Sequence, residues 1–193
     1  ALRIVAARYQ VGDETNVRAA VGRDHQYILR VAREFQGISL LSNMWALADA
    51  TADLSSSTDY MVGFETRLLG LYVDAEGYYK DYDGLYEINY DEQDSDKIRD
   101  ILRRGDGRAY GFDVLLRKRA GKHTGWLSVS TGVSERRIDN LNENEQGDPE
   151  FFKSKFDRGI TVNLIHSWAF RRKWTLNSRV AYASGQPYTQ VLG

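Results

Sequence analysis

The sequence predicts an all-β protein, an antiparallel up-and-down transmembrane β-barrel of the kind found in outer membranes. Three observations lead to this fold class. Short turns alternate with long connections, nearly every expected strand has one uncharged apolar side, and aromatic residues gather near the strand ends. Transmembrane barrels combine these features, because their short turns lie at one end, their long loops lie at the other, and aromatic girdles border an apolar band.

Eight strands are expected, paired as four hairpins with short turns. The pairs are 2–9 with 16–23, 59–67 with 71–86, the two arms of 109–134, and 160–170 with 174–184. Long connections cover 24–57, 88–107 and 135–158. In an up-and-down sheet this alternation puts all short turns at one end and all long loops at the other. Membrane barrels have that asymmetry, with short periplasmic turns and longer extracellular loops.

The hairpin 109–134 shows the apolar alternation most clearly. Tyr110, Phe112, Val114 and Leu116 occupy every second position of its first strand. Side chains of a strand point alternately to opposite faces, so these four share one face. The same reasoning over the last two hairpins predicts nine lipid-facing residues. They are Phe112, Val114, Leu116, Leu127, Val129, Val162, Leu164, Leu176 and Val180.

Aromatic positions add to this interpretation. One group lies near the short turns and consists of Tyr9, Tyr72, Trp126, Trp168, Phe170 and Trp174. A second group lies nearer the long connections and consists of Tyr60, Tyr79, Tyr110 and Tyr182. Two such groups match the aromatic girdles of a membrane barrel, where a ring has one wet edge.

Strand 71–86 carries charge on its other face. Asp74 and Glu76 would be costly inside a dry, narrow barrel unless they are paired. In a wide, water-filled lumen they cost little, which favours a wide barrel. Ligand contacts are expected from the long loops and the upper lumen, where aromatic side chains give large contact areas. The candidates are Trp45, Tyr86, Tyr90, Phe151 and Phe152.

Two helices are expected within the long connections. Ser95 caps the first, which begins at Asp96, buries Ile98, Ile101 and Leu102 on one side, and ends at Gly105. The second is a short helix within 38–52 that includes Trp45 and Leu47.

Composition argues against several function classes. The net charge of −1 gives no basic face for nucleic acid. Cysteine is absent, which excludes thiol catalysis and disulfides. The three histidines lie far apart without companions at metal-ligand spacing. We therefore expect no enzyme activity, no catalytic residue, no metal site and no cofactor.

Several motifs resemble the barrel of TonB-dependent outer-membrane receptors. They are 76–80 (EGYYK) with 84–85 (GL), 105–118 (GDGRAYGFDVLLRK), 125–128 (GWLS), 156–157 (FD), 162–164 (VNL), 172–174 (RKW) and 183–189 (ASGQPYT). The resemblance covers most of the chain in order. It implies that residues 1–193 are part of a single outer-membrane barrel domain, about eight strands of a larger barrel, without a plug domain.

The resemblance also implies a function and partners. Receptors of this family take up a scarce ligand, such as a metal chelate, a vitamin, an oligosaccharide or a peptide. The expected partners are outer-membrane lipid, TonB acting through a plug outside this chain, and a surface lipoprotein. The expected location is the bacterial outer membrane. Two alternatives stay open: a complete eight-stranded outer-membrane barrel with an adhesive or structural role, and a soluble β-barrel that carries a ligand.

Overall fold

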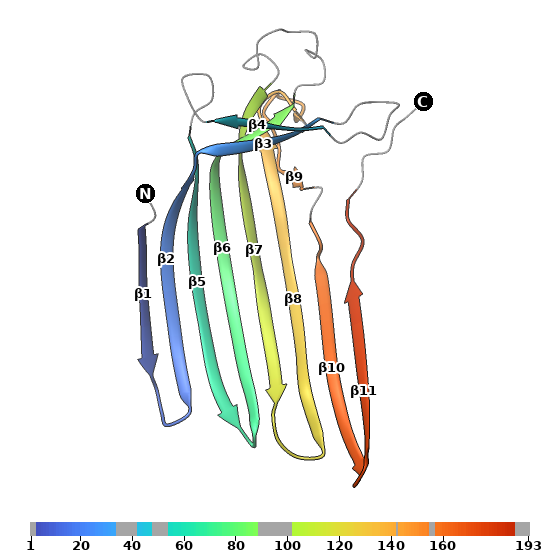
Figure 1. Ribbon diagram of the computed structural model, residues 1–193. Helices are drawn as coiled ribbons and strands as arrows, with labels where there is room; N and C mark the ends of the chain where they lie inside the picture. The colour runs from blue at the N-terminus through green and yellow to red at the C-terminus, as the bar shows by residue number, and fades with distance from the viewer. Residues whose placement is uncertain are drawn as a thin grey trace.

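Eight long strands form one antiparallel sheet in the computed structural model (Figure 1). The structure describes residues 3–33, 42–47, 54–88, 102–141, 143–154 and 157–187. The long strands, in their order across the sheet, are β1 (Arg3–Gln10), β2 (Thr15–Gln26), β5 (Ser55–Leu68), β6 (Leu71–Ile88), β7 (Leu102–Lys118), β8 (His123–Ile138), β10 (Ile160–Arg171) and β11 (Trp174–Ala183). Each long strand pairs with the long strands before and after it in the chain. The predicted up-and-down arrangement is therefore confirmed.

Three short strands were not predicted. β3 (Ile28–Arg33) and β4 (Ser42–Leu47) form a separate two-stranded sheet, and β9 (Phe152–Lys153) pairs with β8. In Figure 1 all three lie at the end of the sheet opposite the short turns. The long strands also extend further into the predicted connections than expected, so that β6 and β7 reach Ile88 and Leu102.

The short turns fix the hairpin registers. Between β5 and β6 only Leu69 and Gly70 separate the paired residues Leu68 and Leu71. Both turn residues have positive φ angles, 52° and 76°. A type I′ turn requires positive φ at both central positions, and its twist matches that of the strands it joins. The second hairpin therefore turns within 68–70, the gap between the two strands that the sequence predicted.

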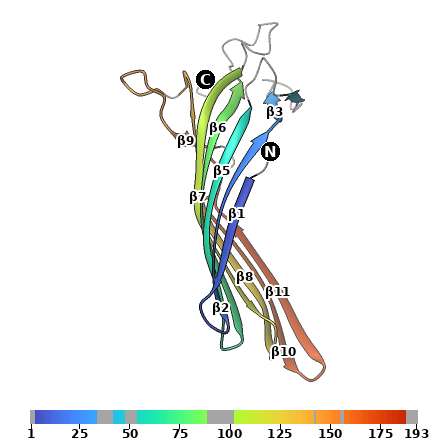
Figure 2. The same cartoon turned by 90° about the vertical axis from the view of Figure 1, so that its left-hand side faces the viewer.

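The sheet is a single layer (Figure 2). The view from its edge shows strands that twist from one side of the sheet to the other, and no described element packs along the length of either face. Among the described residues only Ala75 and Ile138 are buried apolar side chains, whereas Val62 and Val180 are more than half exposed. Soluble domains bury an apolar face against a second layer. This sheet exposes its apolar face instead.

Glycines on the middle strands make room for large neighbouring side chains. Tyr78 of β6 reaches across β7 to β8, and its hydroxyl oxygen would lie 2.8 Å from a methyl group built on Gly132. Its ring also lies against Gly111, the register partner of both residues. Tyr78 therefore packs flat over two strands, and this packing depends on the missing side chains.

β8 changes its partner along its length. Glu135 and Arg136 pair with β9, whereas Thr131 and the residues before it pair with β10. In between, the amide of Ser134 donates a 2.8 Å hydrogen bond to Asp157 Oδ1. The Asp157 carboxylate is 5% exposed and takes the place of a missing ladder acceptor. Asp157 thus supports the switch between β9 and β10.

Both predicted helices are wrong where the structure describes them. Leu102 to Gly105, the expected end of the first helix, belong to β7, because they form a ladder with 85–88 of β6. Trp45 and Leu47, expected in the second helix, belong to β4 and pair with β3. Strand pairing overrides local helix propensity in both places. The remainder of each predicted helix lies outside the described residues.

We predict that Gly132→Ala destabilises the sheet by about 1–3 kcal/mol, because the added methyl group meets the Tyr78 hydroxyl. Tyr78→Phe removes that oxygen, so the same glycine substitution should cost less in the Tyr78→Phe background. Chemical denaturation of the four proteins of this cycle measures the coupling. Gly185→Ala is the control, since a methyl group there meets nothing within 4 Å. An equal cost in both backgrounds would contradict the packing.

Candidate functional site

The two faces of the sheet differ in chemistry. Cross-strand partners share a face, so the register assigns every residue of the long strands to one side. The apolar face contains Val62, Phe112, Val129, Leu164 and their register partners. The polar face contains the continuous register row of Arg18, Gly63, Glu76, Asp113, Ser130 and Thr161. The two faces together are the candidate functional site.

A broad band of the apolar face carries no charge. At the end of the strands near the long connections it stops at a register row that contains Arg3, Arg23, Asp81, Arg108 and Glu135. At the end near the short turns it stops at Lys118 of β7. Every residue of the apolar face between these limits is uncharged on all eight long strands. Charge is therefore confined to the two ends of this face.

All nine residues predicted to face lipid lie on the apolar face. Leu116, Leu127, Leu164 and Val180 form one register row, and Val114, Val129 and Val162 form the next. Phe112 and Leu176 lie on the same side. The two polar interruptions of this face in the last hairpin, His166 and Ser178, are partners of each other. Alternation in the sequence thus correctly predicted which residues share a face.

Tyrosines line up at one border of the uncharged band. Tyr60, Tyr79 and Tyr110 are consecutive register partners, with ring centroids 6.4 Å and 6.5 Å apart. Trp168 and Phe170 lie near the other border, with centroids 5.3 Å apart. Two aromatic residues from the predicted girdles belong elsewhere: Tyr72 and Trp126 are both partners of Arg117 on the polar face. Sequence position alone did not show this, because it gives distance from a turn but not a face.

The tyrosine border leaves the register row of Tyr60, Tyr79 and Tyr110 further across the sheet, at Tyr182. Tyr182 lies in the row of Val114, four residues nearer to the short turns than Tyr110, and five ladder steps separate Tyr60 on β5 from Tyr182 on β11. With about 3.4 Å per residue and 4.8 Å between strands, this offset corresponds to strands tilted by about 30° from the normal of the border. Strands of membrane barrels tilt by a similar angle.

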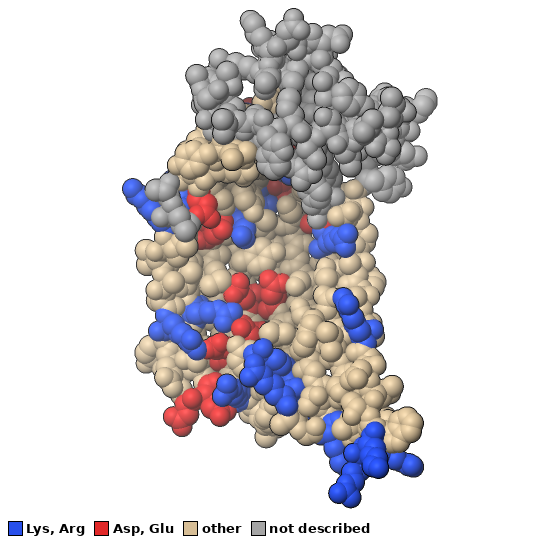
Figure 3. All heavy atoms as spheres, viewed as in Figure 1, with Lys and Arg blue, Asp and Glu red and all other residues tan. Residues whose placement is uncertain are grey.

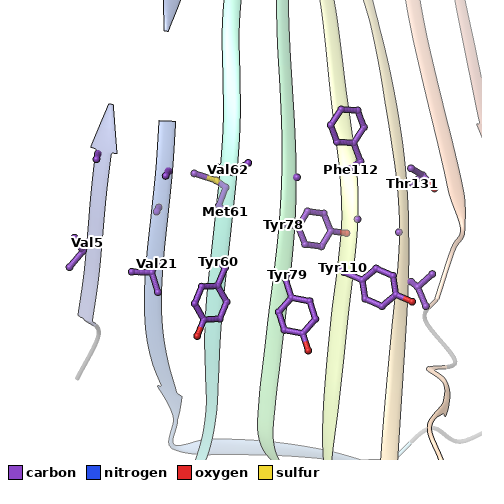
Figure 4. A pocket seen from close by; sticks show the side chains of 17 residues that line it. Val5, Val21, Tyr60, Met61, Val62, Tyr78, Tyr79, Tyr110, Phe112 and Thr131 are labelled. Carbon is purple, nitrogen blue, oxygen red and sulfur yellow. The ribbon is translucent and has the colours of Figure 1, made fainter. Parts of the chain in front are cut away.

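A shallow hollow of about 890 Å³ lies on the apolar face (Figure 4). Its base includes Ala7, Ala19 and Gly77, which belong to one register row and have small or no side chains. Tyr60 and Tyr79 line it from the adjacent row. The hollow therefore arises where three small residues, in a row shared with Val62 and Phe112, lie beside a row of tyrosines. Its lining suits an apolar group such as an acyl chain.

Charged side chains gather in the middle of the polar face (Figure 3). Arg18 of β2 donates to Asp74 at 2.7 Å and to Glu76 at 2.9 Å, both on β6. Glu65 joins the group through Arg18, 3.8 Å away, and through the Tyr72 hydroxyl, which donates to Glu65 at 2.8 Å and to Asp74 at 3.2 Å. Arg8 pairs with the other Glu65 oxygen. Asp74 and Glu76 are therefore paired. Their presence alone does not require a wide, water-filled interior, contrary to the sequence-based argument.

Arg18 reaches β6 by crossing a glycine. Gly63 of β5 lies between Arg18 and Glu76 in the same register row. A methyl group on Gly63 would lie 3.2 Å from the Arg18 Nε atom and 2.9 Å from the Ala75 carbonyl oxygen. The missing side chain gives the guanidinium a direct path over β5. The sequence does not identify Arg18 as the partner of the two carboxylates, because the ion pairs join two hairpins separated by a long connection.

The five predicted ligand contacts do not come together in the described structure. The ring of Phe151 contacts the guanidinium groups of Arg108 and Arg137. Its centroid lies 4.2 Å from the Cζ atom of Arg108 and 5.1 Å from that of Arg137. Phe152 pairs with Arg136, on the opposite side of the ladder. Tyr86 belongs to β6 and pairs with Arg104 of β7, and Trp45 belongs to β4. Tyr90 lies outside the described residues.

The comparisons with known proteins give no relative. No protein-family model matches the chain, and neither the curated proteins nor the solved structures contain a significant match. Within the described ranges, no helix is long and apolar enough to cross a membrane. The same residues contain no group of three or more histidine, aspartate or glutamate side chains that could hold a metal ion.

We predict that Arg18→Met lowers the free energy of unfolding by about 1–3 kcal/mol, because it leaves two partly buried carboxylates without their cation. Adding Asp74→Asn and Glu76→Gln should recover much of the loss, since both groups become neutral. Chemical denaturation measures the effect, and Arg67→Met on an exposed part of β5 is the control. If the triple variant is no more stable than Arg18→Met, the pairing contributes little.

Proposed function

We propose that this chain is a segment of the barrel of a TonB-dependent outer-membrane receptor. In this proposal the apolar face meets lipid, the polar face lines the lumen, and the short turns lie on the periplasmic side. The function is energised uptake of a scarce ligand, such as a metal chelate, a vitamin, an oligosaccharide or a peptide. The observation that carries the membrane assignment is the uncharged band with its two aromatic borders.

The dimensions of the band support a membrane. Arg108 and Lys118 limit it on β7 and lie ten residues apart on the same face. At about 3.4 Å per residue and a tilt of about 30°, this separation covers about 29 Å along the membrane normal. The apolar band of outer-membrane barrels is about 25 Å tall. The nine residues between the two charges also match the length of strand that crosses the hydrocarbon.

The polar face supports a barrel of more than eight strands. An eight-stranded barrel has an interior that side chains just fill. Closing this sheet on itself would direct the Arg18 group, Tyr78, Tyr82 and the Arg117–Tyr72 contact into that narrow space. A wider barrel holds them at its wall and leaves a lumen. The motifs that resemble TonB-dependent receptors favour the same choice.

A soluble β-barrel that carries a ligand is the second candidate, and one observation favours it. The hollow beside Tyr60 and Tyr79 is large enough for an apolar ligand. This function needs the sheet to close with its apolar face inward. It predicts that the protein folds in buffer without detergent, whereas the receptor proposal predicts that it requires a bilayer or a micelle.

We predict that arginine at Val129 blocks insertion into lipid vesicles, whereas arginine at the adjacent Ser130 is tolerated. Val129 lies inside the uncharged band, where a charge facing lipid costs about 2–4 kcal/mol. Ser130 lies on the polar face beside Asp113, which can pair with the new charge. Protease protection after vesicle insertion measures both variants. Leu164→Arg and Asn163→Arg repeat the comparison on β10. Equal tolerance of both faces would contradict the membrane assignment.

We predict that β1 and β11 do not pair with each other. The chain has no cysteine, so Ala6→Cys with Ala181→Cys or Ala183→Cys gives one defined pair in each double variant. All three positions lie on the polar face. A disulfide would require Cα atoms within about 7 Å. Ala6→Cys with Ala20→Cys, which are register partners, is the positive control.

The mass of the intact source protein independently tests whether these eight strands form a complete barrel. A mass several-fold above 22 kDa in the outer-membrane fraction is expected for a receptor. A mass near 22 kDa together with a β1–β11 disulfide would support a complete eight-stranded barrel, and the uptake proposal would be withdrawn.

A further inference from the structure

Two neighbouring short turns carry a concentration of positive charge. The turn-end basic cluster consists of Lys118, at the end of β7, with Arg119 and Lys122 of the following turn, and Arg171, at the end of β10, with Arg172 and Lys173 of the following turn. All six side chains belong to exposed residues. Figure 3 shows the second group as basic side chains at the lower right end of the molecule, far from the acidic side chains at the lower left.

The two turns form one surface. The amide of Ala169 donates a 2.8 Å hydrogen bond to the carbonyl oxygen of Lys122, and His123 is the register partner of Trp168. These contacts hold the β7–β8 turn against the base of the β10–β11 turn. The six cations therefore lie on one continuous surface.

No carboxylate neutralises this cluster within the part of the chain that the structure describes. At the opposite end of the sheet, basic residues have acidic partners: Arg108 pairs with Glu135 at 2.7 Å, and Arg137 pairs with Asp106 at 2.8 Å. The six cations of the cluster have no such ion pair. The sequence has no aspartate or glutamate in 114–134 or 158–193. The cluster thus keeps its full charge for an external partner.

An aromatic stack lies next to the cluster on the apolar face. The His123 ring stacks on His166 and on Trp168, with centroids 5.3 Å and 5.5 Å away. His123 Nδ1 and His166 Nε2 are 3.1 Å apart, within hydrogen-bond distance. Trp168 also contacts Phe170. Rings that combine an apolar body with a polar atom suit the boundary between hydrocarbon and water.

We propose that the turn-end basic cluster and this stack bind anionic phospholipid headgroups of the periplasmic leaflet, of the phosphatidylglycerol type. This inference rests on the proposed membrane orientation. The stack lies where the uncharged band ends, which is the depth of a headgroup phosphate. Each lysine or arginine near an anionic lipid surface adds favourable electrostatic energy, and several together select anionic over zwitterionic lipid. The acidic turn between β1 and β2, with Asp13 and Glu14, would not attract such lipid.

The test compares lipids bound to the intact membrane-inserted protein. The protein is inserted into vesicles of phosphatidylcholine and phosphatidylglycerol in equal amounts, and the co-purified lipids are counted by native mass spectrometry. We expect phosphatidylglycerol to be retained about threefold over phosphatidylcholine. The variant Arg171→Gln/Arg172→Gln/Lys173→Gln should lower this ratio towards one. The matched control Arg3→Gln/Arg23→Gln/Arg158→Gln removes three exposed cations at the other end and should keep the ratio.

The outcomes separate the two proposals. Failure of the intact wild-type source protein to insert into these mixed vesicles would overturn the membrane assignment. Insertion with a ratio near one, or an unchanged ratio in the β10–β11 turn variant, would overturn the lipid site alone. If the cluster instead binds an acidic protein, the ratio of retained phosphatidylglycerol to phosphatidylcholine should be near one. That result would contradict the proposal.

Discussion

The constraint on which this structure depends is that its strands form one layer. No described element covers the length of either face, so order comes from the ladders between neighbouring strands and from side chains that cross them. A sheet in that situation cannot rely on a buried core. Tyr78 over Gly132 and Arg18 over Gly63 replace it, each joining three strands through a position that lacks a side chain. The described residues leave the apolar face without a second layer.

Local features of the fold follow from the sequence. A period of two assigned the apolar positions of β7, β8, β10 and β11 to one face, because alternation needs no knowledge of partners. Hairpin turns such as Leu69–Gly70 also follow, since the residues they join are neighbours in the chain. The helix predicted to end at Leu102 to Gly105 was wrong because its outcome depended on a distant partner. Their helix-like pattern was outweighed by a ladder to β6 that no local pattern shows.

The charged group of the polar face also depends on a distant partner that no local pattern in the sequence shows. Asp74 and Glu76 were visible in the sequence, and so was the alternative that they form ion pairs. Their partner Arg18 is more than fifty residues away in the chain, and only the β2–β5 register brings it near. The aromatic borders could be predicted only in part from the sequence. Their residues could be selected from the sequence, but Tyr72 and Trp126 needed the register to place them on the polar face.

The path of Arg18 over Gly63 has a consequence for the order of assembly. Each hairpin with a short turn closes locally, which is fast. The Arg18 contacts require β2 to meet β5 across residues 27–54, a loop whose closure costs more entropy. Asp74 and Glu76 therefore lack the Arg18 cation until the first two hairpins join. Their mutual repulsion opposes incomplete assemblies, so the network favours the finished register over hairpins that have folded separately.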